Sequence, residues 1–478
     1  MGVEDQDVAL DRPAEECGVL AVSSRDADAA RLSFFGLYAL QHRGQEAAGI
    51  AVADGRAVRV HKDTGLVSQV FDSGTLDPLV GGLAIGHTRY STTGANSERN
   101  VQPYVIETMY GPLGVAHNGN LVNADRLRAE LLERGAGLQS SSDSEVLALM
   151  LAAAPGDSWE ERLAAVMPRW EGAFCLTLIA GTKVIAARDP WGFRPLSMGQ
   201  LPSGGHVVAS ETGALRTLGC EHITEVEPGE IIVLQGDIAR RMQALAPKKD
   251  QARCTFEHIY FSRPDAVWDG LSIHEARQRL GEELAREHPV EADVVIPVPD
   301  SSMPAAIGYS RASGIPYNEG FVKNRYIGRT FIEPTDELRR QGVALKFNTL
   351  PHNITGKRVV IIDDSIVRGT TSGPLVRLVR DAGASEVHVR ITCPPIAHPC
   401  FFGVDMGSYD QLIAHQLGVP EISAHIGSDS LGFLSVEAMM KALGRDEGYC
   451  NACFTGSYPV PVQLTMLSTK DRFDGVLG

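Results

Sequence analysis

The sequence lacks the long apolar runs and the leader segments that mark membrane and secreted proteins. A membrane-spanning helix needs roughly 20 consecutive, mostly apolar residues, and no run of that kind occurs in the 478-residue chain. The first sixteen residues are rich in acidic side chains and contain no apolar stretch, so they do not resemble a signal peptide. Position 6 is Gln6, which fails the pattern for N-terminal myristoylation of Gly2. We therefore expect a cytoplasmic protein without a membrane anchor.

Positive charge is also scarce. The chain has 44 lysines and arginines against 59 aspartates and glutamates, which gives a formal net charge of -15 at pH 7. This charge opposes non-specific binding to nucleic acids and to acidic membrane surfaces. A phosphate-bearing small molecule is still compatible with it if a local basic site holds the phosphate. We expect small-molecule substrates, no nucleic-acid partner and no membrane partner.

Cysteine is infrequent, with eight residues in the chain. In a large acidic chain without a signal sequence, thiols are typical of a reducing compartment, where they are buried, catalytic or metal-bound rather than paired in disulfides. The hydrophobic content of 44% and the charged content of 22% are those of a soluble globular protein. Because 478 residues are too many for one ordinary core, the length predicts two domains.

The most specific pattern lies in residues 358–372. Residues 359–362 are β-branched and apolar, which predicts a buried strand of a parallel sheet. Two acids, Asp363 and Asp364, stand at the carboxyl end of that strand, and a loop with Gly369 and several hydroxyl groups follows. This layout suits a sugar phosphate, because the two carboxylates can reach ribose hydroxyls and a magnesium ion.

A helix is predicted directly after this loop, since Pro374 suits a first helical turn and the next apolar residues have helical spacing. Backbone N–H groups at a helix start bind phosphate. An ordinary strand, turn and helix would contain the same elements. The full string, however, closely resembles the PRPP-binding motif of type I phosphoribosyltransferases, which implies a domain with a parallel sheet. The resemblance assigns PRPP binding to Asp363, Asp364, Ser365, Arg368, Gly369, Thr370 and Thr371.

Two more segments of this half carry polar side chains. Residues 294–298 predict another buried strand, which runs into a hydroxyl-rich turn with Ser301 and suits a pyrophosphate or magnesium contact. We expect one Mg²⁺ per subunit, bound by Ser301, Asp363 and Asp364. Residues 323–332 interleave basic and aromatic side chains. We interpret them as a flexible loop that closes on a polyanion, rather than as a solvated surface loop. Its expected PRPP contacts are Lys323, Arg325 and Arg329.

The first half of the chain carries five short motifs. They are Cys17-Gly18-Val19, Gln41-His42-Arg43-Gly44, His87-Thr88-Arg89-Tyr90-Ser91-Thr92, Asn118-Gly119-Asn120 and Ser142-Asp143-Ser144-Glu145. Taken singly they are turns, helix caps and a buried cysteine. Together they resemble the class II glutamine amidotransferase domain of the N-terminal-nucleophile hydrolases. The resemblance implies a four-layer αββα fold that begins at Cys17 and ends near residues 246–249.

Apolar spacing also predicts the local elements around these motifs. It indicates a strand at residues 18–22, a helix at residues 31–42 and a strand at residues 115–120 that ends in a glycine turn. A further apolar helix is predicted around Val146, with Asp143 or Ser144 as its N-cap.

The residue types of the first half fit glutamine hydrolysis. The Cys17 thiol is the expected nucleophile, which attacks the carboxamide, forms a thioester and releases ammonia. Its own α-amine can serve as the base if Cys17 is the mature N-terminus, because an α-amine has a pKa of about 8. The resemblance therefore implies that residues 1–16 are a propeptide that is removed.

The other catalytic roles are also implied by the resemblance. The Asn118 side chain and the Gly119 N–H form the expected oxyanion hole. Arg89 is expected to clamp the α-carboxylate of glutamine in a two-point ion pair. Asp143 is expected to bind the α-ammonium group.

Four cysteines suggest a metal centre in the second half. They are Cys254, Cys400, Cys450 and Cys453, the last two forming a CxxC pair. Spacing alone does not separate zinc from iron–sulfur, or either one from unliganded core cysteines. Taken with the other segments, the motifs resemble amidophosphoribosyltransferases of the iron–sulfur subtype over nearly the whole chain after Glu16. That resemblance implies one [4Fe-4S] cluster per subunit, with Cys393 as a rival ligand to Cys400.

The resemblance implies a propeptide at 1–16, a class II amidotransferase domain at 17–247, a phosphoribosyltransferase domain at 254–455 and a tail at 456–478. The expected reaction makes 5-phosphoribosylamine, glutamate and pyrophosphate from glutamine and PRPP, the first step of purine synthesis. A homotetramer and feedback inhibition by purine nucleotides are expected by the same resemblance. Two alternatives remain open at this point: another class II amidotransferase, forming an amino sugar or asparagine, and a PRPP-sensing regulator without activity.

Overall fold

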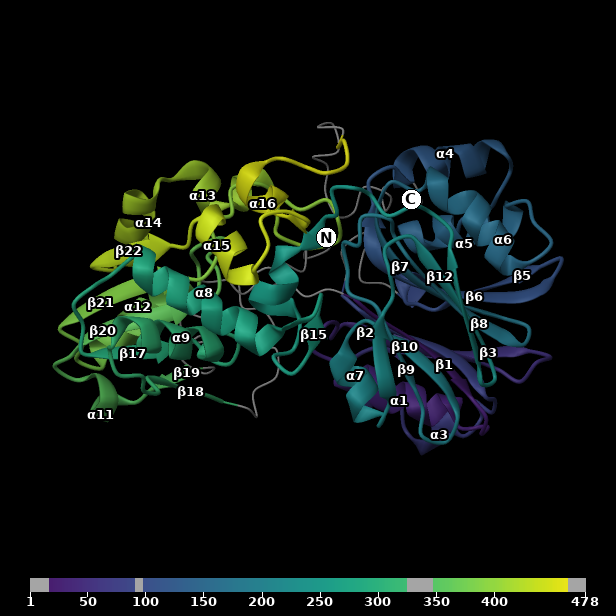
Figure 1. The fold of residues 1–478 in the computed structure, drawn as a ribbon, viewed down its shortest axis with the longest axis horizontal. Coiled ribbons are helices and arrows are strands. Elements are labelled where there is room, and N and C mark those ends of the chain that lie inside the picture. Colours follow the sequence, from purple (N-terminus) through teal and green to yellow (C-terminus); the bar gives the residue numbers. More distant parts are fainter. Residues whose placement is uncertain (1–16, 91–97, 325–346, 463–478) are drawn as a thin grey trace, which may run out of the picture.

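The computed structural model describes residues 17–90, 98–324 and 347–462. Two lobes lie side by side in it, one formed by the first half of the chain and coloured purple to teal, the other formed by the second half and coloured teal to yellow (Figure 1). The predicted motif residues Ser91 and Thr92, the predicted contacts Arg325 and Arg329 and the expected propeptide lie outside the described residues.

The N-terminal lobe is built on two antiparallel sheets. The first has the order β11-β9-β10-β1-β4-β2-β3 and the second has the order β13-β12-β8-β7-β6-β5. The strands of the first sheet are β1 (Gly18–Ser24), β2 (Ala47–Ala53), β3 (Val58–Thr64), β4 (Leu83–Arg89), β9 (Ser197–Gln200), β10 (Gly205–Ala209) and β11 (Glu221–Glu225). Those of the second are β5 (Tyr104–Thr108), β6 (Gly111–Leu121), β7 (Gly172–Ala180), β8 (Lys183–Arg188), β12 (Glu230–Gln235) and β13 (Ile238–Gln243).

Helices cover the outer face of each sheet. On the first sheet lie α1 (Ala29–Ala39) and α7 (Thr212–Thr217), and on the second lie α5 (Asp143–Ala153), flanked by α4 (Ala124–Glu133), and α6 (Trp159–Val166). The inner faces pack on each other through a hydrophobic core of small and β-branched side chains, among them Val19, Ile85 and Ile179. The lobe therefore has the four-layer αββα fold that the sequence predicted. Short elements complete it: α2 (Val67–Val70), α3 (Ser73–Leu76), η1 (Glu98–Asn100) and η2 (Met167–Arg169).

Two local predictions for this lobe need correction. The predicted helix at 31–42 is α1, which begins at Ala29 and ends at Ala39. The N-cap of α5 is Ser142, not Asp143 or Ser144, because the Ser142 hydroxyl accepts the Ser144 N–H at 3.2 Å and the helix itself begins at Asp143. The serine run before this helix offers several capping oxygens, so sequence alone placed the cap one or two residues late.

The C-terminal lobe is built on a parallel sheet with the order β17-β20-β21-β22. Its strands are β17 (Val294–Pro297), β20 (Arg358–Asp363), β21 (Glu386–Ile391) and β22 (Ser430–Phe433). The register sets Ile296 opposite Ile361, and Ile361 opposite Val389. These side chains belong to one large core, as expected for strands covered on both faces. The predicted strands at 294–298 and 359–362 are thus confirmed as β17 and β20.

The main helices of this lobe are α8 (Ile273–Glu287), α9 (Met303–Ser313), α12 (Ser372–Asp381), α14 (Val419–Ile426) and α15 (Val436–Leu443). The predicted helix near Pro374 is α12, which begins two residues before that proline. Shorter elements are β14 (Arg253–Cys254), η3 (Glu257–Phe261), β15 (Val267–Trp268), β16 (Leu271–Ser272), β18 (Phe321–Lys323), β19 (Phe347–Thr349), α11 (Pro351–Ile354), η4 (Tyr409–Gln411), α13 (Ile413–Gln416), β23 (Tyr449–Cys450) and α16 (Ala452–Thr455).

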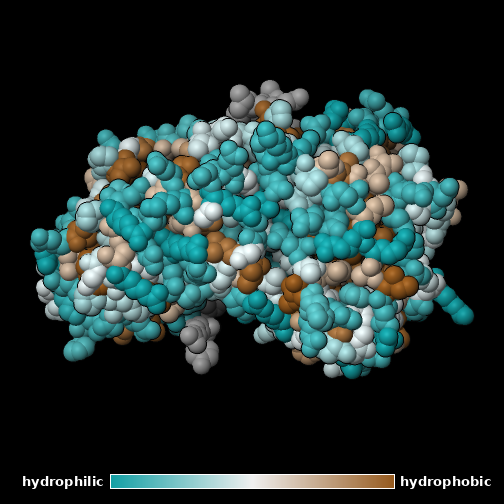
Figure 2. Space-filling view, in the orientation of Figure 1, coloured by the Kyte–Doolittle hydropathy of each residue, from teal (hydrophilic) through white to brown (hydrophobic). Residues whose placement is uncertain are grey.

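The surface is largely polar. Figure 2 shows a face on which hydrophilic side chains dominate and hydrophobic ones are scattered in small groups. Among the helices in the described part of the chain, none combines the length and apolar character needed to cross a membrane.

Candidate active sites

The predicted nucleophile stands at the start of the central strand of the first sheet. Cys17 immediately precedes β1 and its side chain is buried. The thiol donates a hydrogen bond to the carbonyl oxygen of Tyr90 at 3.4 Å. The Cys17 carbonyl in turn accepts a hydrogen bond from Arg43 Nε at 3.1 Å. The backbone and the thiol of Cys17 are thus both fixed by neighbouring segments.

The predicted oxyanion hole lies at the end of β6, in the second sheet. Asn118 is buried, and its side-chain nitrogen has no hydrogen-bond partner among the described residues, so it can donate to a ligand. Gly119 has a φ of +144°, and a Cβ there would meet the carbonyl oxygen of Ala173 at 2.1 Å. Only glycine fits this position. The predicted strand at 115–120 is β6, which continues through the expected glycine turn to Leu121. The residue type and backbone shape of Gly119 therefore agree with an anion-binding N–H group within this strand.

The two predicted glutamine-binding residues come from different layers. Arg89 is the last residue of β4 and is buried. Asp143 is the first residue of α5, and its Oδ2 accepts the Leu121 N–H at 3.0 Å, which ties α5 to the end of β6. His87 connects the two sheets, because its Nε2 lies 3.1 Å from the carbonyl oxygen of His117. Burial lowers the pKa of His87 to about 3, so its ring is neutral. These contacts bring the ends of β4, β6 and α5 together.

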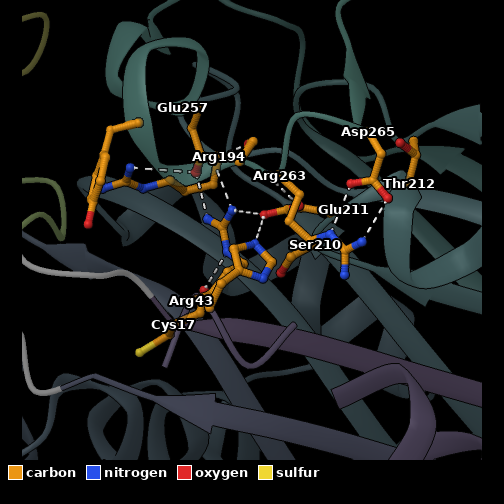
Figure 3. A network of polar contacts seen from close by, with 12 residues as sticks. Cys17, Arg43, Arg194, Ser210, Glu211, Thr212, Glu257, Arg263 and Asp265 are labelled. Carbon is orange, nitrogen blue, oxygen red and sulfur yellow. Dashed lines mark hydrogen bonds and ion pairs between the residues drawn. The ribbon is translucent and has the colours of Figure 1, made fainter. Parts of the chain in front are cut away.

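A buried ion network lies beside Cys17 and continues into the C-terminal lobe (Figure 3). Arg43 Nη1 lies 2.7 Å from Glu211 Oε1, and its Nη2 lies 2.6 Å from Glu257 Oε1. Glu211 also contacts His42 at 2.8 Å and accepts the Arg263 N–H at 3.1 Å. Burial favours the neutral form of Glu211, but His42 and Arg43 outweigh it and lower its pKa to about 2. Glu211 is therefore ionised at neutral pH.

The acidic pair of the C-terminal lobe stands at the carboxyl end of β20, as predicted. Asp363 and Asp364 are buried, and each accepts a hydroxyl donor from the turn after β17. Ser301 donates to Asp364 Oδ2 at 2.5 Å, and Ser302 donates to Asp363 Oδ1 at 3.1 Å. The structure thus brings Ser301 together with both acids. Two carboxylates with substrate oxygens and water are a common donor set for Mg²⁺, so these residues fit the ion.

The loop between β20 and α12 frames this pair. Ser365 is fully buried and donates to Asp364 Oδ1 at 3.1 Å. Gly369 has a φ of +74°, and a Cβ there would meet Ile413 Cδ1 at 2.7 Å. Thr371 is the N-cap of α12, so the predicted hydroxyl loop leads into a helix N-terminus that can bind phosphate. Thr370 lies in the same loop and is exposed.

Two of the predicted basic residues lie near this site. Lys323 Nζ binds Asp300 Oδ2 at 2.7 Å, next to Ser301. Arg368 Nη2 donates to Gln411 Oε1 at 3.0 Å. Arg325 and Arg329 belong to the residues that the structure does not describe.

Comparison with known proteins identifies the family. A family model described as "Glutamine amidotransferase domain" matches residues 87–217. The protein named amidophosphoribosyltransferase in Synechococcus elongatus is 49% identical over 466 residues, covering 96% of this chain and 94% of its own. The chain belongs to the amidophosphoribosyltransferase family. The Bacillus subtilis protein of that name is 46% identical over 454 residues, with 94% and 95% coverage.

A solved amidophosphoribosyltransferase has the same fold. The B. subtilis glutamine PRPP amidotransferase complexed with ADP and GMP superimposes with a TM-score of 0.88 at 45% identity, covering 94% of this chain and 98% of that one. The chain is thus a transferase of purine biosynthesis with a glutamine amidotransferase domain. Membership decides against both alternatives that the sequence left open.

The four predicted cluster cysteines are neighbours in the C-terminal lobe. Cys254 and Cys450 are direct partners in the parallel ladder of β14 and β23. Burial, together with the neighbouring thiols of Cys450, Cys254 and Cys400, raises the pKa of Cys453 well above its usual value. Within the described residues, no three His, Cys, Asp or Glu side chains are arranged to hold a metal ion.

The rival ligand occupies a different position. Cys393 is fully buried in the core, and its pKa is raised by burial and then by the nearby Asp364 and Asp363. Cys400 is half-buried, and its Sγ accepts the Phe402 N–H at 3.3 Å. Cys393 and Cys400 both raise the pKa of Cys453, so both lie near it. The choice of Cys400 as the ligand stays a prediction.

Sequence reasoning missed the residues that join the lobes. Arg43 belongs to one of the five motifs without an expected role, and no motif singles out the roles of Glu211 and Glu257. Arg194 lies in a polar turn that carries no catalytic signal, yet its Nη2 donates to the Phe402 carbonyl at 2.7 Å. The one signal in the sequence was the charge of Arg43 inside a motif, which could have suggested a buried ion pair. The partners of Arg43, about 170 to 210 positions away, were not readable without the fold.

Proposed function

We propose that this chain makes 5-phosphoribosylamine from glutamine and PRPP, releasing glutamate and pyrophosphate. The observation that carries the proposal is the presence in one chain of both sites. One has a buried thiol, Cys17, and a buried amide donor without a partner among the described residues, Asn118. The other is an acidic pair, Asp363 and Asp364, that leads into a helix N-terminus.

The glutaminase half-reaction follows from the first site. The Cys17 sulfur attacks the carboxamide carbon, and the oxygen that becomes negative is held by the Asn118 amide and the Gly119 N–H. Collapse breaks the C–N bond, and the amine leaves as ammonia after it takes a proton. Water then cleaves the thioester and glutamate is released. We assign the α-carboxylate of glutamine to Arg89 and its α-ammonium to Asp143.

The base in this half-reaction is the α-amine of Cys17. This assignment requires removal of residues 1–16, and the proposal includes that maturation. An α-amine with a pKa of about 8 accepts the thiol proton near neutral pH and returns it to the leaving ammonia.

The transfer half-reaction follows from the second site. The ribose hydroxyls bind Asp363 and Asp364, and the 5-phosphate binds the loop of Ser365, Gly369, Thr370 and Thr371 at the start of α12. Ammonia attacks C1 while the bond to pyrophosphate breaks, so the anomeric centre inverts. Lys323, Arg325, Arg329 and Arg368 are the proposed cations for the pyrophosphate and phosphate oxygens. A bound Mg²⁺ would neutralise charge on the pyrophosphate.

We further propose that PRPP binding stimulates the glutaminase. Residues 323–332 carry three cations that pyrophosphate can draw inward, and Lys323 already lies beside Ser301 through Asp300. A ligand shifts such an equilibrium only through contacts that it makes in one state and not in the other. These charge pairs would supply the difference, and ammonia would pass between the sites inside the protein.

The remaining parts of the proposal concern the cofactor and regulation. We assign a [4Fe-4S] cluster to Cys254, Cys400, Cys450 and Cys453, because the thiols of Cys254, Cys400 and Cys450 all lie close enough to Cys453 to raise its pKa and thiolates are the usual ligands of such a cluster. We also propose domains at 17–247 and 254–455, a homotetramer and a cytoplasmic location. The B. subtilis neighbour was solved with ADP and GMP, so purine nucleotides are the proposed inhibitors here.

The test is pyrophosphate release from PRPP by the full-length protein. Glutamine or a high concentration of ammonium should each support release, and glutamate should appear only with glutamine. If ammonium supports pyrophosphate release and glutamine does not, the glutaminase assignment is wrong. No release with either nitrogen source would remove the transferase assignment.

A further inference from the structure

A short segment of the C-terminal lobe, residues 401–403, lies directly against the proposed oxyanion hole. The Asn120 side-chain N–H donates to the Phe401 carbonyl at 2.9 Å, although the two residues are 281 positions apart. A Cβ on Gly403 would meet the carbonyl carbon of Gly119 at 3.1 Å and its Cα at 3.3 Å. The segment therefore contacts Gly119 and Asn120, the two residues of β6 that follow Asn118.

The segment itself is held firmly. The Phe402 ring is buried and stacks on Phe193 with ring centroids 4.4 Å apart. The Phe402 carbonyl accepts a hydrogen bond from Arg194 Nη2 at 2.7 Å, and its N–H donates to the Cys400 sulfur at 3.3 Å. The backbone carbonyl of Phe402 is thus bound by the N-terminal lobe, and its backbone N–H is bound by Cys400, one of the four predicted cluster cysteines.

We propose that residues 401–403 are a positioning element of the glutaminase oxyanion hole. The proposal rests on the proposed role of Asn118 and Gly119. The Gly119 N–H can bind the oxyanion only if the peptide keeps its orientation, and β6 ends two residues later. The Phe401 carbonyl fixes Asn120 on one side of that peptide, and Gly403 fills the space against Gly119.

Gly403 is required by this contact for two reasons. Its φ is +104°, in the region that favours glycine, and a Cβ there would press on the Gly119 backbone as well as on Arg194 Nη2, at 3.3 Å. Gly403→Ala should therefore shift the Gly119 peptide. A matched control is Gly383→Ala, because Gly383 has a φ of +93° and its Cβ would meet Thr355 Cγ2 at 3.1 Å. The two variants carry similar backbone strain, and only Gly403→Ala presses on β6.

Asn120→Asp is a second, isosteric variant, which removes the N–H donor to Phe401 and keeps the side-chain shape. Its control is Asn123→Asp, because the Asn123 amide donates to the Arg169 carbonyl at the same distance, 2.9 Å, within the N-terminal lobe. Loss of that bond does not touch the C-terminal lobe.

Two measurements decide the proposal. The first is whether the variant changes kcat or KM of the glutaminase, and the second is the inhibition constant of glutamate γ-semialdehyde. This aldehyde adds to the Cys17 thiol and places an oxyanion in the hole, whereas glutamine binding in the ground state does not. Losing an oxyanion donor outright costs about 100- to 1,000-fold in kcat, so a displaced one should cost at least about tenfold. The aldehyde constant should rise by a similar factor while KM stays within about twofold.

The expected result is this split in Gly403→Ala and Asn120→Asp, with ammonia-dependent synthesis, iron content and visible absorbance as in the wild type. Both control variants should keep the wild-type kcat. A wild-type kcat in Asn120→Asp, or an equal loss in the controls, overturns the proposal, and this holds even if Gly403→Ala does not fold. If Asn118→Ala also keeps the wild-type kcat, the oxyanion-hole assignment itself is wrong. If Asn118→Ala loses activity and Asn120→Asp does not, only the positioning role fails.

Discussion

Arg43 and Glu257 form a two-point ion pair that is completely buried between the lobes. Arg43 Nη2 lies 2.6 Å from Glu257 Oε1, and Nη1 lies 2.9 Å from Oε2. The third nitrogen of the same guanidinium donates to the Cys17 carbonyl. A carboxylate from the C-terminal lobe therefore fixes the group that holds the proposed nucleophile.

Glu257→Ala should lower both stability and glutaminase kcat. Removing one partner leaves a buried, partly uncompensated charge, which typically costs about 3–5 kcal/mol. The control is Glu171→Ala, which breaks the exposed 3.0 Å pair between Glu171 and Arg126. Such a surface pair contributes about 0–1 kcal/mol. Urea unfolding curves of the two variants provide the measurement. Equal curves would show that the buried pair stabilises the protein no more than the exposed one.

Glu211 should make the protein acid-sensitive. Its pKa is about 2 in the folded protein against an ordinary value of 4.5, because His42 and Arg43 outweigh the effect of burial. A carboxylate whose pKa is lowered by folding adds stability above its unfolded pKa, and this stability is lost as the pH falls. Between pH 4.5 and about 2 the contribution should disappear. The stability difference between wild type and Glu211→Gln, measured by urea unfolding, should therefore shrink on acidification. A difference that stays constant with pH would contradict this assignment.

Sequence predicted the residues whose chemistry is local. Asp363 and Asp364 stand at the end of an apolar strand, so their positions were readable from the neighbouring residues. The glycine at position 119 was expected to mark a turn, whereas β6 continues through it to Leu121. The contacts of Arg43 with Glu257 and of Phe401 with Asn120 were not readable in this way, because these partners are 214 and 281 positions apart and meet only through the packing of two lobes. A motif identifies the residue that performs chemistry. It does not identify the distant group that holds that residue in place.

Asp364→Asn should weaken PRPP binding and slow synthesis from ammonia as well as from glutamine. The buried Asp364 carboxylate accepts Ser301 and Ser365 through its two oxygens, and an amide keeps only one acceptor and no charge. Losing a buried charge contact costs about 2 kcal/mol or more, which is about thirtyfold in kcat/KM for PRPP. Asp293→Asn is the control, because Asp293 binds Arg358 at the opposite end of β20.

Thr371→Val tests the phosphate loop in the same assay. Valine keeps the β-branched shape of Thr371 and removes its hydroxyl at the N-cap of α12. We expect a higher KM for PRPP with either nitrogen source and an unchanged rate of Cys17 alkylation by an electrophilic glutamine analogue. A loss confined to the glutamine-dependent rate would place the acceptor site elsewhere.

The cysteine group should contain iron and inorganic sulfide. Anaerobically purified protein is expected to absorb broadly in the visible range, and Cys453→Ser should lose iron and unfold at a lower temperature, since metal binding to such a site is linked to folding. Cys220→Ser is the control, because Cys220 is buried in the N-terminal lobe. Stoichiometric zinc without iron would refute the cluster. If Cys393→Ser loses iron and Cys400→Ser keeps it, then Cys393 and not Cys400 is the fourth ligand.

Cys17 should be the first residue of the active protein. The proposed base is its own α-amine, which exists only after residues 1–16 have been removed. Intact mass spectrometry of active enzyme should therefore give a chain that begins at Cys17. Cys17→Ala should lose glutamine-dependent synthesis and keep ammonia-dependent synthesis, because the two sites lie in different lobes. A chain expressed directly from Cys17, after removal of its initiator methionine, should be active without processing. Full glutaminase activity in a protein that still carries residues 1–16 would show that another group accepts the thiol proton, and the amine mechanism would then be wrong.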